Sequence, residues 1–199
     1  MKKPVIAIIA AIVVIAAGVL IYRGFGPGDK PAGLDQALAR GSLAKLAVHD
    51  TPKPLPDLPM TRLDGSPVGL DAYRGRVVLL NLWATWCAPC IEEMPALLRL
   101  QTSRGGPDFT VLAVAADQGG AAVVAPFLDR LQLTGLDVTI DKSMKTLGAL
   151  QVAGLPTTLI IDRQGREVAR LVGIAHWDEP EGVALIDAVA ALGQPADND

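Results

Sequence analysis

The chain has 199 residues, with 18 Lys and Arg against 21 Asp and Glu, a net charge of −3, and half of its residues are apolar. This mildly acidic balance provides no electrostatic footprint for nucleic acid, which argues against a protein that binds the phosphate backbone. The sequence has no long repeats and one membrane-length apolar segment. A solenoid and a multi-spanning transporter are therefore excluded, and about 145 residues are left for one globular domain.

The first 23 residues predict a membrane-spanning helix. Lys2 and Lys3 precede an uncharged run at 5–22, which as a helix is about 27 Å long, close to the thickness of a hydrocarbon core. The positive flank predicts an N-terminus in the cytoplasm and an exported body, with Arg23 as a single opposing charge. A cleaved signal peptide is the alternative, but its apolar region is usually shorter, and the best cleavage site, 16–18, lies inside the run. We therefore expect a retained signal-anchor.

Residues 24–56 are expected to form a linker. Its first part, 24–30, is a glycine-rich tether, and 34–48 has the pattern of a weak amphipathic helix. The sequence TPKPLP at 51–56 indicates a stiff, polyproline-like stretch that ends the linker. The globular domain is then predicted over 57–195.

From residue 58 onward the apolar pattern changes repeatedly between strand and helix. The segments 77–83 and 109–115 are continuous apolar runs, which are typical of strands buried on both faces. Asp64-Gly65 and the turn at 162–165 indicate two hairpins. The other expected elements are strands at 58–63, 67–70, 137–140, 157–161 and 167–172, and helices at 88–103, 121–131 with Pro126, 143–150 and 179–192. This order predicts an α/β fold with a central mixed sheet between helices.

The two cysteines lie close together, at Cys87-Ala-Pro-Cys90. A structural zinc site needs four ligands, and only His49 and His176, both distant in sequence, remain to complete one. A purely structural disulfide that closes so short a loop removes little entropy from the unfolded chain. The pair is therefore predicted to be redox-active.

The position of the pair explains its chemistry. Cys87 falls where a buried strand gives way to a helix, and the free amide groups and dipole of a helix N-terminus stabilise a thiolate. Cys90, one turn later, can resolve a mixed disulfide formed by Cys87. Pro89 suits a first helical turn, and Ala88 adds no charge.

Two motifs carry a family resemblance. The sequence VVLLNLWATWCAPCIEEMP at 77–95 resembles the active-site segment of thioredoxin-fold proteins. With Glu93 and Pro95 it is similar to the C-x-x-C-x-x-E-x-P pattern of the TlpA/ResA-type group of membrane-anchored thiol–disulfide interchange proteins. GLPTTLIID at 154–162 resembles the cis-proline loop of that fold and the strand after it. The resemblance covers about residues 55–193, and it implies a thioredoxin-like fold.

The resemblance also implies roles for single residues. Cys87 and Cys90 become the nucleophile and the resolving thiol, and Pro156 the cis-proline beside them. Trp86 would lie on the substrate-facing surface, whereas Trp83 is expected to pack in the core.

In two respects the chain departs from many thioredoxins. Asn81 stands where they place a buried Asp, and an amide does not titrate. Glu93 is either its substitute or a surface charge favoured by the helix dipole. In addition, the two cysteines leave none for the extra structural disulfide that some TlpA-like proteins carry.

The expected function is a thiol–disulfide oxidoreductase tethered to the cytoplasmic membrane with its catalytic domain in the periplasm. The resemblance implies that it reduces exported proteins for cofactor insertion, as in the maturation of cytochrome c or cytochrome oxidase, and takes electrons from a membrane-embedded thiol carrier. No dissociable cofactor is needed.

Two alternatives stay open. One is a copper chaperone that binds Cu(I) through the cysteines, helped by methionines such as Met60, Met94 or Met144 and by His176. The C-x-x-C spacing disfavours it, because copper-delivering relatives resemble C-x-x-x-C. The other is a disulfide oxidant or isomerase on the same fold.

Overall fold

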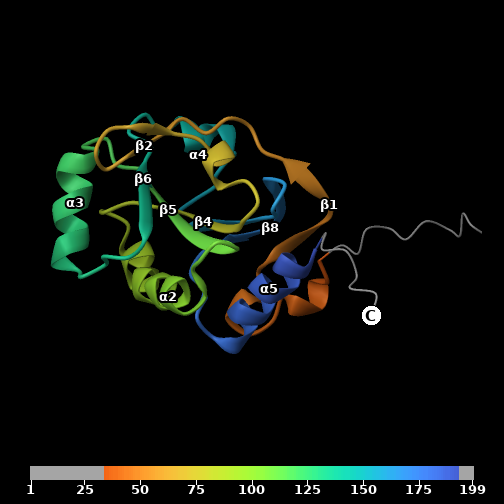
Figure 1. Ribbon diagram of the computed structural model, residues 1–199. Helices are drawn as coiled ribbons and strands as arrows, with labels where there is room; N and C mark the ends of the chain where they lie inside the picture. The colour runs from red at the N-terminus through yellow and green to blue at the C-terminus, as the bar shows by residue number, and fades with distance from the viewer. Residues whose placement is uncertain (1–33, 193–199) are drawn as a thin grey trace, which may run out of the picture. The chain divides into compact units, whose positions relative to one another are not determined.

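The computed structural model describes residues 34–192, which are built around one mixed sheet of eight strands (Figure 1). The predicted membrane helix at 1–23 and the tether at 24–30 lie outside the described residues. Among the helices of the described part, none is long and apolar enough to cross a membrane.

The strand order in the sheet is β1-β8-β7-β4-β5-β6-β2-β3. The neighbours β4, β5 and β6 run parallel, and every other pair is antiparallel. The strands are β1 (Ala47–Pro54), β2 (Met60–Arg62), β3 (Pro67–Val68), β4 (Val77–Trp83), β5 (Phe109–Ala115), β6 (Asp137–Ile140), β7 (Thr157–Ile161) and β8 (Arg166–Val172).

Helices cover both faces of the sheet. Figure 1 shows α2 (Ala88–Arg104) and α5 (Pro180–Ala191) below the sheet and α4 (Lys145–Ala149) above it, with α3 (Ala121–Arg130) at one side. Because side chains alternate along a strand, β4 supplies Leu79 and Trp83 to one apolar cluster and Leu80 and Leu82 to the other. The first cluster holds both cysteines and the large buried apolar side chains of α2 and α5.

The structure confirms the thioredoxin-like α/β fold and most of its elements. The two apolar runs form β4 and β5 with the predicted bounds, and every residue of both strands is buried. Both expected hairpins are present, as β2–β3 and β7–β8. In the second, Asp162 accepts hydrogen bonds from the backbone of Gln164 and Arg166, which closes the turn.

The prediction of a linker up to residue 56 was wrong for its second half. Residues 47–54 form β1, which pairs antiparallel with β8 at the edge of the sheet. Prolines are tolerated on an edge strand, because a missing amide hydrogen facing outward costs no ladder hydrogen bond. The fold thus starts well before the predicted boundary at 57.

The predicted amphipathic helix at 34–48 was also wrong. Two short 3-10 turns, η1 (Gln36–Leu38) and η2 (Gly41–Leu43), stand in its place, and the backbone φ of +57° at Gly41 breaks any continuous helix. The apolar residues of this segment are nevertheless used, since Leu34, Leu43 and Leu46 are buried in the cluster that contains α2 and α5.

Candidate functional site

The two cysteines form a disulfide at the start of α2, where β4 has just ended. Cys87 is the N-cap residue of the helix, and the backbone N–H of Cys90 points at its Sγ at 3.3 Å. Both residues are buried, with Cys87 5 % exposed and Cys90 1 %, so Cys87 is the more exposed residue of the pair. An N-cap thiolate receives hydrogen bonds from the first turn and the field of the helix dipole, which favours Cys87 as the attacking sulfur.

The loop before Cys87 is held by a carboxylate from the neighbouring strand's end. Asp117, which follows β5 and is buried, accepts hydrogen bonds from the hydroxyl of Thr85 at 2.6 Å and from its backbone N–H at 3.0 Å. Parallel strands β4 and β5 end at the same edge of the sheet, which brings these residues together. The bidentate contact fixes the backbone two residues before the disulfide.

A buried carboxyl lies one helical turn after Cys90. Glu93 is 1 % exposed, and its position three residues after Cys90 places both side chains on the same face of α2. The surface-charge interpretation of Glu93 is therefore wrong. Its Oε1 accepts from the backbone N–H of Ala175 at 3.0 Å and the indole N–H of Trp177 at 2.6 Å, and its Oε2 accepts from Asn81 at 3.0 Å.

Burial dominates the electrostatics of this carboxyl. Removal from water raises the pKa of Glu93 from 4.5 to about 6, although the three hydrogen bonds and the charge of His176 act in the opposite direction. A group with a pKa near 6 exchanges its proton in the neutral range, as a general acid or base requires. Glu93 is thus suited to take a proton from the Cys90 thiol and to return it.

Asn81, on strand β4, contacts the Glu93 carboxyl from the sheet. The residue is buried on β4, and its amide nitrogen donates to Thr158 on β7 as well as to Glu93. Asn81 and Thr158 lie opposite each other in the β4–β7 ladder, so the sheet register sets this contact. A neutral amide bridges strand and helix, and the titratable group of the pair is Glu93.

Exposed apolar side chains and the cis-proline lie near the cysteine loop in the fold. Trp86, just before Cys87, is 65 % exposed, and Val172 at the end of β8 is also exposed. The Leu155–Pro156 peptide bond is cis, as predicted, and Gly173 donates its N–H to the Pro156 carbonyl at 2.9 Å. Because Thr157 pairs with both Leu82 and Val172, Pro156 lies at the sheet edge from which the Cys87 loop emerges. The cis-proline and the end of β8 thus lie at the end of the sheet where β4 leads into the cysteine loop.

The histidines considered for a metal site lie apart from the cysteines or face the solvent. His49 on β1 contacts the buried Glu167 of β8 at 2.8 Å, and His176 is exposed. Within residues 34–192, no three His, Cys, Asp or Glu side chains converge as metal ligands would. Met60 packs in the core cluster that does not contain the cysteines, whereas Met94 packs in the cluster that does.

The sequence did not reveal two contributors to the site. Asp117 contacts a residue 32 positions away, and Trp177 one 84 positions away. An acidic residue just after the apolar run at 109–115 was a detectable signal for Asp117. Nothing in the local pattern assigned a partner to Trp177.

Comparison with known proteins agrees with this site. Residues 50–186 match the Redoxin family. A thiol-disulfide oxidoreductase ResA of Bacillus cereus is 34% identical over 130 residues, which cover 65% of this chain and 74% of the relative. ResA of Geobacillus kaustophilus is 38% identical over 117 residues, 59% of this chain and 66% of the relative.

Solved structures give the same result. A Chlorobium tepidum protein proposed to be the thiol:disulfide interchange protein DsbE superposes with a TM-score of 0.62 at 29% identity, over 70% of this chain and 96% of its own. The exposed lipoprotein thioredoxin Etrx1 of Streptococcus pneumoniae gives 0.55 at 26% identity, over 67% and 98%. The chain therefore belongs to the Redoxin family, as a thiol–disulfide oxidoreductase of the TlpA/ResA type.

Proposed function

We propose that this oxidoreductase is a disulfide reductase that works in the periplasm, tethered to the cytoplasmic membrane by the apolar N-terminal segment at 5–22. The observation that carries the reductase chemistry is the buried Glu93 carboxyl one turn after Cys90, beneath a Cys87 that caps the same helix. This arrangement supplies a stabilised thiolate at Cys87 and a proton acceptor for Cys90. The uncharged Ala88-Pro89 pair between the cysteines lacks a group that would stabilise the thiolate further, as strong oxidants require.

The reaction proceeds in two exchanges. The Cys87 thiolate attacks one sulfur of a client disulfide, forms a mixed disulfide and releases the other client sulfur as a thiolate. Cys90 then passes its proton to Glu93 and attacks Cys87 Sγ, which breaks the mixed disulfide and releases the second client thiolate. The client gains two electrons, and the enzyme is left with its Cys87–Cys90 disulfide.

The proposed clients are exported proteins whose cysteines must be reduced before a cofactor is inserted, such as apocytochrome c or the copper-binding subunit of cytochrome oxidase. Their compartment is oxidising, so the enzyme needs a source of electrons after each turnover. A membrane-embedded thiol carrier would re-reduce the disulfide. The exposed apolar side chains of Trp86 and Val172 are the proposed client surface, because Trp86 directly precedes Cys87 and Val172 lies at the end of the sheet where β4 leads into the cysteine loop.

The reduction potential tests the direction of electron flow. The full-length protein in detergent would be equilibrated against glutathione and dithiothreitol buffers, with tryptophan fluorescence as the readout. A potential near or below about −270 mV supports a reductant, and a value near about −120 mV makes the protein a disulfide donor and overturns the proposal. Cys87→Ser and Cys90→Ser variants serve as controls, since neither should show a redox-dependent signal.

A topology experiment tests the location. Alkaline phosphatase fused after residue 199 folds only when it is exported, whereas a fused green fluorescent protein matures in the cytoplasm. Phosphatase activity in the membrane fraction, with an intact N-terminus by mass spectrometry, supports a retained anchor. Activity in the soluble periplasmic fraction would mean that the segment is cleaved, and cytoplasmic fluorescence would contradict export.

A further inference from the structure

The Glu93 carboxyl is held on one side by a single short segment that is remote in sequence. Ala175 and Trp177, in the connection between β8 and α5, both donate to Oε1, at 3.0 and 2.6 Å. Oε2 receives one donor, the amide of Asn81. A carboxylate oxygen has two lone pairs, so Oε1 is saturated, and Oε2 keeps one lone pair for a proton.

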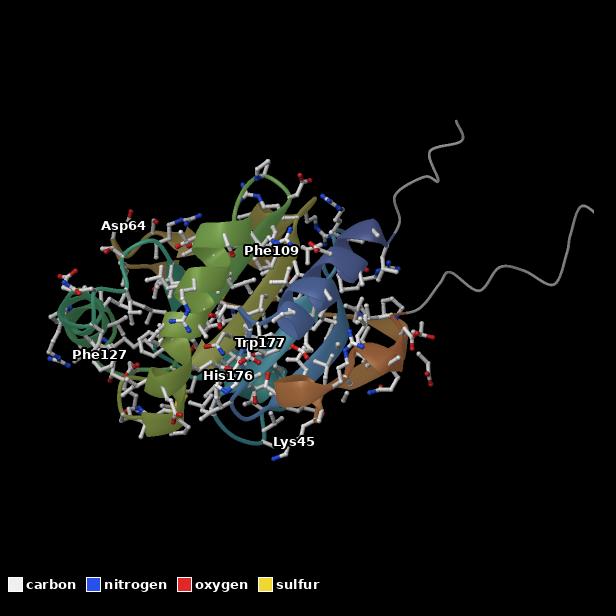
Figure 2. All side chains as sticks on the ribbon, turned by 90° about the horizontal axis from the view of Figure 1, so that it is seen from below. Lys45, Asp64, Phe109, Phe127, His176 and Trp177 are labelled. Atoms are coloured by element: carbon white, nitrogen blue, oxygen red, sulfur yellow. A yellow bond between two sulfur atoms is a disulfide. The ribbon has the colours of Figure 1, made fainter. Side chains whose placement is uncertain are left out.

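Trp177 is well placed to hold this geometry. Its side chain is fully buried in the cluster that contains both cysteines, and Figure 2 shows it between helices α2 and α5, beside His176. A buried indole N–H usually has a hydrogen-bond acceptor, and the acceptor of Trp177 is Glu93.

Two further contacts fix the backbone of the segment. The N–H of His176 donates to Ser42 Oγ at 3.0 Å, which ties the segment to η2. On the other side, α5 approaches so closely at Gly182 that a Cβ there would collide with the Trp177 carbonyl. The indole therefore comes to Glu93 from a backbone that has little freedom to move.

We propose that Trp177 is a positioning residue that occupies Glu93 Oε1 and thereby directs the proton of Cys90 to Oε2. The indole N–H favours the carboxylate form, which is the form that can accept the proton. This inference rests on the proposed role of Glu93 in the reductase. It adds that a residue of the β8–α5 connection, Trp177, controls the pKa of the Glu93 carboxyl.

Few other groups act on Glu93. Of the titratable groups, Cys90 lies one turn earlier on the same face of α2, and His176 on the β8–α5 connection lowers the Glu93 pKa by its charge. Strands β4 and β7 present the neutral Asn81 and Thr158. Asp178, next to the segment, is paired with Arg99 at 2.6 Å. Trp177 and Asn81 are thus the two side chains of the described residues that donate to this carboxyl.

The test is a carbon-13 NMR titration of the Glu93 carboxyl in the oxidised full-length protein, in which the cysteines do not titrate. The wild type should titrate with a pKa of about 6. Trp177→Phe should raise this midpoint by about one pH unit, because it removes a hydrogen bond to the charged form. Trp83→Phe is the matched control, since the Trp83 indole is equally buried but its N–H has no partner among the described residues. In this variant the Glu93 midpoint should equal that of the wild type.

A second measurement uses the wild type alone, so that its outcome does not depend on whether Trp177→Phe folds. The indole N–H resonance of Trp177 should move downfield with the same midpoint as the Glu93 carboxyl. A midpoint unchanged in Trp177→Phe, or an indole resonance that does not follow Glu93, overturns the proposal.

Kinetics separate this proposal from the proposed function. The rate of mixed-disulfide resolution should be measured as a function of pH. In Trp177→Phe the midpoint of this profile should shift to higher pH by the same amount as the midpoint of the Glu93 carboxyl. If Glu93→Gln leaves that profile unchanged, the role of Glu93 as proton acceptor fails, while the NMR titration still decides whether Trp177 controls its protonation.

Discussion

Asn81 and Glu93 are joined by a hydrogen bond of 3.0 Å, from the amide nitrogen of a strand residue to the carboxyl of a helix residue. Both side chains are buried, and the second amide atom, Oδ1 of Asn81, has no partner among the described residues. Many thioredoxins have an acid at the position of Asn81. Here the acid is on the helix that carries the cysteines, and the strand contributes a neutral donor that holds it.

The raised pKa of Glu93 predicts a specific pH dependence of stability. The folded state binds the Glu93 proton more tightly than the unfolded chain, because burial raises the pKa from 4.5 to about 6. The resulting stabilisation is complete below pH 4.5 and is lost as the pH rises through about 6. The loss amounts to about 2 kcal/mol in the free energy of unfolding.

Guanidinium denaturation of the oxidised protein between pH 4.5 and 8 measures this effect. Glu93→Gln should remove the decline, since a Gln does not titrate and the Asn81 amide can turn to offer its Oδ1. The difference between the two proteins isolates Glu93 from all other carboxyls. If the two stability curves ran parallel across this range, the assignment of the raised pKa to Glu93 would be refuted.

The Asp117–Thr85 contact predicts a second effect, on the loop before the disulfide. Thr85→Val removes the hydroxyl that donates to Asp117 at 2.6 Å but keeps the shape of the side chain. We expect the free energy of unfolding to fall by about 1.5 kcal/mol, because the lost bond is to a charged group. We also expect a lower kcat/KM for a model disulfide, because Trp86 and Cys87 follow directly on the loosened backbone.

Thr85→Ser is the matched control for this variant. It retains the hydroxyl, so both stability and kcat/KM should stay close to those of the wild type. Denaturation and steady-state kinetics of the three proteins give the comparison. Equal kinetics for the Val and Ser variants would show that Asp117 does not position the loop.

The parts of the fold that sequence reasoning predicted are those specified by local patterns. β4 and β5 were located to the residue because strands covered on both faces are continuously apolar. The C-x-x-C turn followed from the strand and helix around it. β1 was missed because its apolar signal is weak and its prolines, which an edge strand tolerates, are also typical of a linker.

The remainder of the site depends on contacts between distant residues. A glutamate in an early turn of a helix can face the solvent or the core, and only the packing of the β8–α5 connection buries Glu93. Similarly, Asp117 reaches Thr85 only because β4 and β5 are parallel neighbours. The spacing of residues along the chain predicts neither the burial of Glu93 nor the contact between Asp117 and Thr85.

The buried Glu167 carboxylate, which contacts His49 and Arg170, predicts a stability effect away from the cysteines. Burial raises the pKa of Glu167, but hydrogen bonds from Arg170 and His49 outweigh it, so the pKa lies below its usual value. The Arg170 guanidinium binds both carboxylate oxygens, at 2.8 and 2.9 Å. Arg170→Met leaves this charge buried with His49 alone, and we expect a loss of about 3 kcal/mol at neutral pH.

The pH dependence distinguishes this charge effect from lost packing. Because the Glu167 pKa is lowered, the contribution of the pair is present above the ordinary carboxyl pKa and disappears as the pH falls through the lowered value. The wild type and Arg170→Met should therefore converge in acid. The double variant Glu167→Gln/Arg170→Met should recover part of the loss at pH 7, and a double variant as unstable as Arg170→Met would contradict the charge explanation.

The early start of the fold predicts where the chain can be truncated. A fragment that begins at residue 57 lacks β1 and the buried side chains of Leu34, Leu43 and Leu46, whereas one that begins at residue 33 retains them. Burial of three leucines contributes about 5 kcal/mol, which is comparable to the whole stability of many domains.

We expect the 33–199 fragment to unfold cooperatively and the 57–199 fragment to be largely unfolded at 25 °C, as measured by circular dichroism and guanidinium denaturation. A triple variant of the longer fragment, Leu34→Ala/Leu43→Ala/Leu46→Ala, retains β1 and isolates the leucines. Equal midpoints for the two fragments would show that the segment before residue 57 is dispensable, because the sheet would then be stable without its edge strand.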